Sequence, residues 1–260
     1  MALFEFELAE VEDIVPWQTS DGPSLSWFAL TDGRFHMLVG DQVLFEYSDE
    51  ILAQWGSSVR TADYQIAAFA REMLGSVAAA SARLPERIER LAADWHRLSD
   101  LQRVAESAVG DEEEDLAYAA WRWLGERSPW TSYLVASPNL QFVRVDEEVH
   151  IHWDNRDRVV DGLAVWTAQV GVFSMGVESF VQECKDFAAR LLLAMEDRIG
   201  TIEAGPVKAQ AVLNPQSLRQ QHETWRAEFD SYFGEYHPDI AWPEAERALQ
   251  VLAKKKGVSF

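Results

Sequence analysis

The sequence has one cysteine, no long apolar run and few basic residues. A single cysteine, Cys184, excludes an internal disulfide framework and a cysteine-rich metal site. No stretch approaches the roughly 18 apolar residues that a membrane span needs. The first residues carry neither a basic segment nor a continuous apolar segment, so we expect no signal peptide. These absences favour a soluble cytoplasmic protein.

The shortage of positive charge is the strongest compositional bias. Lys and Arg total 23 against 43 Asp and Glu, which gives a net charge of −20 at pH 7. A strongly acidic surface repels nucleic-acid phosphates and anionic lipids, so direct nucleic-acid binding and membrane binding are disfavoured. Hydrophobic residues make up 48% of the chain, which is too many for a disordered acidic tail. We expect one compact folded unit over residues 1–260.

The negative charge is concentrated in two parts of the chain. Residues 1–60 contain 11 acidic and 2 basic residues, and residues 111–155 contain 10 acidic and 3 basic residues. In the first part, FEFEL alternates apolar and acidic residues, and residues 25–48 predict three short strands joined by polar turns. In the second part, residues 140–155 predict a hairpin, and residues 163–173 predict a third strand. Both acidic parts are therefore expected to be rich in β-strands.

Stretches with helical periodicity follow each set of strands. Apolar residues recur at helical spacing between residues 66 and 77, 84 and 95, 116 and 126, 180 and 195, and 218 and 229, and Pro243 is placed to begin a last helix. The predicted class is α+β, with antiparallel β-meanders each followed by long helices.

The two halves of the chain share this order of elements. Residues 27–41 align without a gap with residues 141–155, and three of the fifteen positions are identical. This number of identities can arise by chance, but the order of hairpin, third strand and long helix also recurs. We expect either an internal pseudo-repeat with halves 1–110 and 111–260 or a chance similarity between two acidic hairpins.

The beginning of the chain carries a recognisable series of motifs. FEFEL is followed by a Pro-Trp pair ending at Trp17, by WFALTDG from Trp27 to Gly33, and by an aromatic strand and Tyr64. Over about residues 3–75 this series resembles a bacterial family catalogued only as a domain of unknown function. The resemblance implies a bacterial, non-secreted protein. It implies no activity and no catalytic residue.

The acidic strands predict a surface that binds a basic protein. A negative surface attracts a basic partner and matches the charge of a basic cleft. We expect a non-catalytic, cytoplasmic binding protein without a cofactor, of the immunity or antitoxin type, that neutralises a basic, nuclease-like toxin. The candidate partner-binding residues are Asp32, Asp41, Glu46, Asp49, Glu50, Asp146, Glu147, Glu148 and Asp154.

A metal-dependent enzyme or metal-binding protein is the alternative. His150 and His152 are two residues apart in a predicted strand, so their side chains share one face with Glu148 and Asp154. Zn²⁺ accepts such ligands but needs a third protein ligand, for which His36 is the candidate. The competing interpretation is a polar, solvent-facing side of a sheet. No nucleotide-binding, hydrolase or kinase motif is present in the sequence.

Single polar residues on apolar stripes are expected to belong to the core. Cys184 lies within a helical apolar stripe, where a cysteine packs as a small hydrophobe with a raised pKa. His222 lies on a similar stripe. Most of the 11 Trp residues are expected in the core, with two or three exposed. A structural subunit that is held in an assembly by exposed aromatic residues is a third candidate function.

Overall fold

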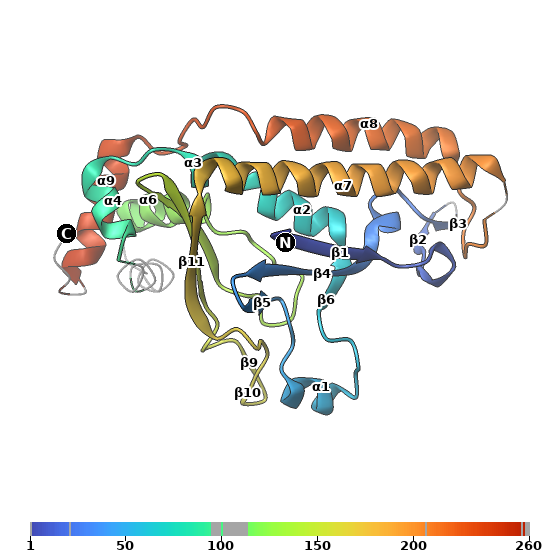
Figure 1. Cartoon of the computed structure of the whole chain (residues 1–260), viewed down its shortest axis with the longest axis horizontal. Helices are drawn as coiled ribbons and strands as arrows, with labels where there is room; N and C mark the ends of the chain where they lie inside the picture. The colour runs from blue at the N-terminus through green and yellow to red at the C-terminus, as the bar shows by residue number, and fades with distance from the viewer. Residues whose placement is uncertain are drawn as a thin grey trace.

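Two antiparallel sheets lie along one long helix, and further helices pack against them (Figure 1). This computed structural model describes residues 2–20, 22–94, 100, 114–205, 207–255 and 257. The predicted α+β class is confirmed. Within these residues, no helix has the length and apolar character needed to cross a membrane.

The first sheet is built around β4 (Asp32–Val39). Strand β1 (Phe4–Leu8) pairs with one edge of β4, while β6 (Ala62–Gln65) and β5 (Gln42–Leu44) share its other edge. All three pairings are antiparallel. The central strand β4 therefore has the first strand of the chain, β1, as its neighbour at one edge.

One face of the first sheet forms the centre of the main core. Phe35 and Met37 of β4 are fully buried, as the alternation in their strand predicts. Phe4 of β1 stacks on Phe187 with ring centroids 4.9 Å apart, and Phe69 stacks on Phe35 at 4.1 Å. These aromatic contacts join strands and helices that are far apart in the sequence.

The second sheet has β8 (Glu148–Asp154) at its centre, between β7 (Leu140–Val145) and β11 (Val170–Gly176). The predicted hairpin of residues 140–155 is confirmed. The third strand begins later than expected, because a separate hairpin of β9 (Val159–Val160) and β10 (Leu163–Ala164) precedes it.

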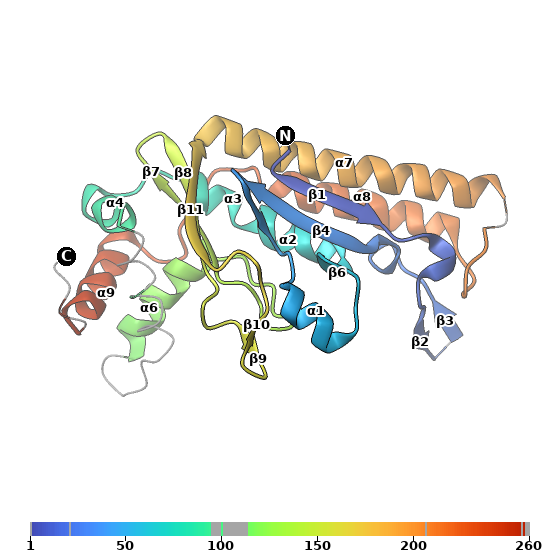
Figure 2. The same ribbon diagram turned by 60° about the horizontal axis from the view of Figure 1, so that its bottom comes forward.

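Helix α7 (Val177–Ala204) follows β11 directly and runs across both sheets (Figure 2). Its buried stripe contains the residues expected from the periodicity, including Cys184 and Phe187. Helix α8 (Pro215–Ser231) lies alongside α7, and α2 (Ile66–Gly75) and α3 (Val77–Ser81) also pack against it. These helices cover the core face of the first sheet.

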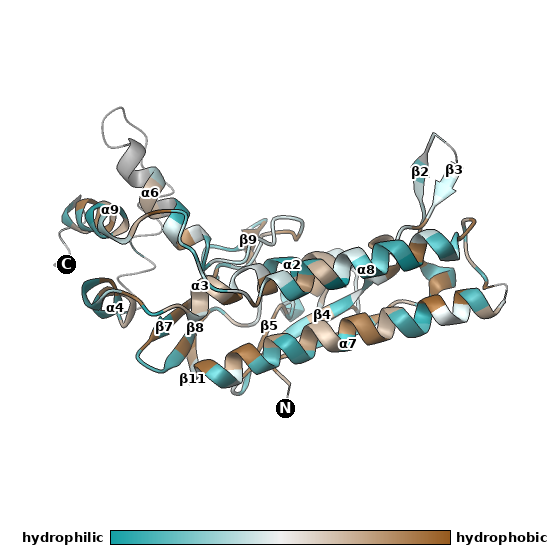
Figure 3. Cartoon of the chain, turned by 90° about the horizontal axis from the view of Figure 1, so that it is seen from above, coloured by the Kyte–Doolittle hydropathy of each residue, from teal (hydrophilic) through white to brown (hydrophobic). Residues whose placement is uncertain are grey.

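A second apolar cluster lies at one end of the molecule (Figure 3). It is formed by α4 (Glu86–Ala92), α6 (Glu114–Gly125) and α9 (Trp242–Lys255). Val143 of β7 is fully buried in this cluster, so the second sheet is covered on both faces at this edge. Trp95, predicted at the end of the α4 helix, lies outside the described residues.

Several short elements complete the fold. They are the 3-10 turns Val11–Asp13 and Ala29–Thr31, the hairpin of β2 (Trp17–Thr19) and β3 (Gly22–Ser24), and helix α1 (Asp49–Trp55).

The prediction of a strand at residues 25–30 is wrong. This segment forms a turn and the 3-10 turn Ala29–Thr31 before β4 begins. Its alternating apolar residues meet a helix instead of a strand: Trp27 is fully buried and stacks on Trp225 of α8 at 5.0 Å. The backbone NH of Trp27 donates a hydrogen bond to Gln221 Oε1 (2.9 Å). Tertiary contacts with α8 therefore determine its conformation.

The internal pseudo-repeat is not confirmed. Residues 141–145 belong to a strand that pairs with β8, whereas the aligned residues 27–31 form no strand. Strand β8 pairs with β7, which directly precedes it in the sequence. Strand β4 pairs instead with β1, and other elements lie between these two strands in the sequence. The two sheets therefore differ in connectivity.

Candidate protein-binding site

The outward side of the first sheet gathers charged side chains from several strands. Because side chains alternate along a strand, Glu5 and Glu7 point away from the core that buries Phe4. Across the sheet, Glu5 lies opposite His36 and Glu7 lies opposite Arg34. Strands β1 and β4 thus place two carboxylates, Glu5 and Glu7, beside the side chains of His36 and Arg34.

Strand β6 extends this arrangement on the other side of β4. Asp63 lies opposite Arg34, and Gln65 Nε2 donates a hydrogen bond to Asp32 Oδ1 (3.5 Å). Arg34 is the one Lys or Arg among the residues of β1, β4, β5 and β6. We call the following residues the acidic face: Glu5, Glu7, Asp32, Glu46 and Asp63.

The members of the acidic face act on one another electrostatically. Burial raises the pKa of the Asp32 carboxyl, and the neighbouring Asp63 carboxylate raises it further. Burial lowers the pKa of His36, whereas Glu5 and Glu46 raise it. Like charges that lie close together on a sheet are destabilising. Asp32 and Asp63 therefore repel each other, whereas Glu5 is ion-paired with Arg190 (3.4 Å) and the nearby Arg198 lowers the pKa of Asp32.

Other acidic residues lie beside this face at helix α1. Ser48 is the N-cap of the helix, and Asp49 and Glu50 follow it in the first turn, where carboxylates interact favourably with the helix dipole. Arg60 forms ion pairs with Glu46 (3.4 Å) and Asp49 (3.0 Å). The α1 residues are thus joined to the acidic face through Glu46, and Arg60 compensates part of the charge.

The remaining predicted acidic residues lie elsewhere. Asp41 is exposed in the turn after β4, at the opposite end of this strand from Asp32, and the strand is about 23 Å long at roughly 3.3 Å per residue. Asp146 and Glu147 form the turn between β7 and β8, and Glu148 begins β8 in the second sheet. The structure therefore places Asp32 and Glu46 on one face, with Asp49 and Glu50 at its edge, and separates the other five from it.

Glu147 and Asp154 already have partners within the chain. Glu147 forms ion pairs with Arg83 (2.5 Å) and Arg144 (2.8 Å). Asp154 is only 4% exposed and accepts two hydrogen bonds from the guanidinium of Arg156, at 2.9 and 2.7 Å. The expectation that Asp154 lies on an accessible acidic surface is wrong, because its carboxylate is buried and paired.

The structure does not bring together the three histidines of the alternative hypothesis, a metal site. His36 belongs to the first sheet, whereas His150 and His152 belong to the second. Among the residues that the structure describes, no group of three or more His, Cys, Asp or Glu side chains could hold a metal ion. His152 is 3% exposed, and burial together with the adjacent His150 lowers its pKa to about 3. His152 is therefore a neutral, buried residue, and the face that carries it is open to solvent only toward Glu148 and His150.

The expectations for Cys184 and His222 are confirmed. Both residues are fully buried, and burial raises the pKa of the Cys184 thiol. His222 Nδ1 accepts a hydrogen bond from Trp27 Nε1 (3.1 Å). Cys184 therefore has the environment of a packing residue, and His222 is a hydrogen-bonded core histidine.

The exposure of the Trp residues can be compared with the expectation of two or three for the described side chains. Among the Trp residues whose side chains the structure describes, Trp17, Trp55 and Trp130 are exposed, by 51%, 38% and 72%.

Sequence reasoning missed three members of the acidic face: Glu5, Glu7 and Asp63. The alternation in FEFEL already indicates that Glu5 and Glu7 share the outward side of β1. It does not indicate that β1 pairs with β4, and no strand was predicted at residues 62–65, where Asp63 lies. The missing information was the pairing of strands.

The comparisons with known proteins identify a family and nothing more specific. No curated protein and no solved structure matches the chain. A family model described as "Family of unknown function (DUF5984)" matches residues 3–248, which is nearly the whole chain. The resemblance to a family of unknown function therefore extends well beyond the N-terminal motifs. The chain belongs to the family of unknown function DUF5984.

Proposed function

We propose that the protein is a non-catalytic binding protein whose acidic face docks on a basic protein partner. The observation that supports this most strongly is the convergence of five carboxylates from three strands and the segment after β5, which outnumber the arginines beside them: Arg34 in the sheet, and Arg60 and Arg190 outside it. Within the chain, Glu5 is ion-paired with Arg190 and Glu46 with Arg60, both at 3.4 Å, whereas Asp32 and Asp63 repel each other. A basic partner would turn the repulsion into attraction.

The form of the surface suits electrostatic docking. Glu7 and Asp63 are exposed, whereas Glu5, Asp32 and Glu46 are half-buried and held in place by the sheet. Carboxylates that are fixed in position lose little conformational freedom when a cationic side chain binds. Complementary charge also accelerates association and disfavours acidic competitors.

A basic, nuclease-like toxin is the partner class that we propose. Such a protein has a cationic substrate cleft, and an acidic sheet face can occupy it in place of nucleic acid. The protein would then act as an immunity or antitoxin protein in the cytoplasm, where its one free thiol, Cys184, needs no oxidising environment.

The proposal is tested by comparing two variants with equal net charge. The face variant combines Glu5→Gln, Glu7→Gln and Asp63→Asn. The control variant neutralises three exposed acidic residues that are not part of the acidic face. It combines Asp197→Asn in α7, Asp230→Asn in α8 and Glu235→Gln in the segment after α8.

Tagged wild-type protein and both variants are used to capture partners from the native host, and the captured proteins are identified and quantified. The proposal requires a basic protein that wild type and the control variant retain and that the face variant loses. Equal capture of every bound protein by the two variants would contradict it.

A further inference from the structure

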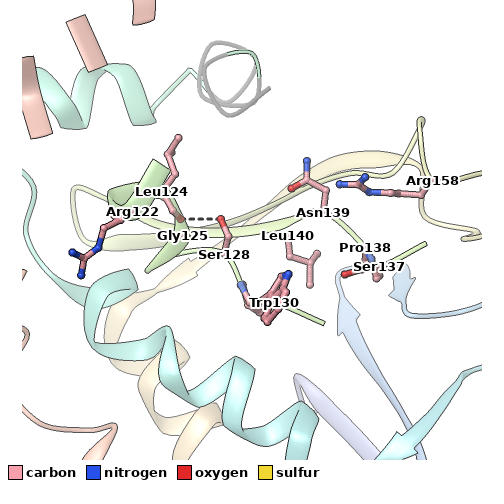
Figure 4. Close-up of a pocket in the computed structure, with 11 residues that line it drawn as sticks. Arg122, Leu124, Gly125, Ser128, Trp130, Ser137, Pro138, Asn139, Leu140 and Arg158 are labelled. Carbon is pink, nitrogen blue, oxygen red and sulfur yellow. Dashed lines mark hydrogen bonds between the residues drawn. The ribbon is translucent and has the colours of Figure 1, made fainter. Parts of the chain in front are cut away.

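A pocket of about 570 Å³ opens beside the second sheet (Figure 4). It lies between the end of α6, residues 128–140 and the segment that leads into β9. Its volume falls in the range of sites that bind small molecules. Its lining includes Pro129, Trp130, Pro138, Asn139, Leu140 and Arg158.

The charge of this pocket is opposite to that of the whole chain. Its described lining contains two arginines and no acidic residue, although the chain carries a net charge of −20. Arg122 is ion-paired with Asp239. Arg158 is less well compensated: its Nε is buried without a hydrogen-bond partner in the part of the chain that is described, and Asp157 Oδ1 lies 3.7 Å away. In Figure 4 the Arg158 side chain extends toward Asn139.

An aromatic ring forms another part of the wall. Trp130 is 72% exposed, which is the largest exposure among the large hydrophobic residues of the pocket. Pro138 and Leu140 add apolar surface beside it. A tryptophan that is open to solvent offers a flat surface on which a planar ring can stack. The pocket therefore combines a stacking surface with Arg158, whose Nε has no hydrogen-bond partner among the described residues.

The wall of the pocket is held in place by hydrogen bonds from the rest of the fold. The backbone NH of Trp130 donates to Glu72 Oε2 (3.2 Å), and Trp166 Nε1 donates to the carbonyl oxygen of Ala136 (2.7 Å). Thr131 Oγ1 and Ser137 Oγ lie 2.8 Å apart, and the NH of Asn139 donates to Asn155 Oδ1 (2.9 Å). A ligand would therefore find the pocket already formed and would not have to order the loop.

We propose that this pocket binds a small planar anion, namely an aromatic ring that carries a carboxylate or a phosphate group. The ring stacks on Trp130, and the anionic group accepts hydrogen bonds from Arg158. Guanidinium groups bind both anions in a similar forked geometry. This site is separate from the acidic face and does not depend on the function proposed for that face.

Two matched pairs of probes test the ligand class by calorimetric titration of the full chain. Naphthalene-2-carboxylate is compared with the neutral naphthalene-2-carboxamide, and adenosine monophosphate is compared with adenosine. Binding of either anion with a clear preference over its neutral match supports the proposal, and the pair that shows the preference identifies a carboxylate or a phosphate ligand. Absence of binding by both anions in the millimolar range overturns it.

Two variants test whether the pocket holds the ligand. Arg158→Gln is expected to weaken binding of the anion about tenfold or more, because it removes a charge-assisted hydrogen bond. Trp130→Ala is expected to weaken binding about fivefold or more, because it removes the stacking surface. Its side chain is mostly exposed, so this variant also tests the site if Arg158→Gln fails to fold.

The controls remove the same types of side chain outside the pocket. Arg87→Gln removes an exposed arginine of α4, and Trp17→Ala removes an exposed tryptophan of β2. Both controls are expected to bind the anion as wild type does. Equal affinity of the two pocket variants and wild type would overturn the assignment of the site.

Discussion

Asn155 is expected to be one of the most sensitive polar residues of the fold. It is 2% exposed and joins two segments: its Oδ1 accepts a hydrogen bond from the NH of Asn139, and its Nδ2 donates one to the carbonyl oxygen of Ala168, both at 2.9 Å. Asn155→Ala leaves this donor and this acceptor without their partner. Each unsatisfied buried group costs about 1–3 kcal/mol, so we expect a loss of about 3 kcal/mol in the free energy of unfolding.

Urea unfolding followed by tryptophan fluorescence measures this loss directly. At about 2–4 °C per kcal/mol for a chain of this size, the melting temperature should fall by about 6–12 °C. Asn139→Ala is the control, because it keeps the backbone NH that bonds to Asn155, and it should cost less than about 1 kcal/mol. A loss of less than about 1 kcal/mol for Asn155→Ala would refute the argument that these two hydrogen bonds hold the segments together.

Three further predictions concern the second sheet, the acidic face and the core. Gly171→Ala should lower the free energy of unfolding by about 1–3 kcal/mol in urea titrations, because a Cβ there would collide with the ring of Trp153; an unchanged midpoint would contradict this. Asp63→Asn should lower the pKa of Asp32 in an NMR carboxyl titration. A raised native pKa means that the contribution of Asp32 to stability is largest in acid and is lost as the pH rises through that pKa, so the variant should lose less stability between acid and neutral pH. Cys184 should react with a thiol reagent only after denaturant unfolds the chain, because its thiol is fully buried and its pKa is raised; rapid reaction of the native protein would argue against this environment.

The helices could be predicted from the sequence because their apolar faces are local patterns. The stripe that contains Phe180 and Phe187 repeats every three or four residues over several turns, and the structure buries it in α7. The apolar residues from Leu218 to Phe229 behave in the same way in α8. Such a pattern depends only on which residues face the core.

The segment around Trp27 shows why part of the fold could not be predicted. Its alternating apolar residues suit a strand, but in the structure they pack against Trp225 about 200 residues later. A pattern of apolar residues indicates burial and does not identify the element that provides it.

The candidate site depends even more on distant pairing. The alternation in β1 predicts that Glu5 points outward. It does not predict that Glu5 lies beside His36, because the β2–β3 hairpin and the 3-10 turns separate β1 from β4 in the sequence. The same limitation led to the wrong grouping of His36 with His150. Both histidines lie in central strands, but in different sheets.

The affinity of the acidic face for a defined polycation tests the central claim most directly. Wild type, the face variant and the control variant are titrated with a fluorescent dodecalysine peptide at low and at high salt. Three lost charge pairs of about 0.2–1 kcal/mol each correspond to about a tenfold loss of affinity for the face variant at low salt. The account predicts this loss for the face variant alone, with the difference between the variants shrinking at high salt. Equal weakening of both variants, which have the same net charge, would show that the peptide senses only the overall charge and would contradict a docking surface on the first sheet.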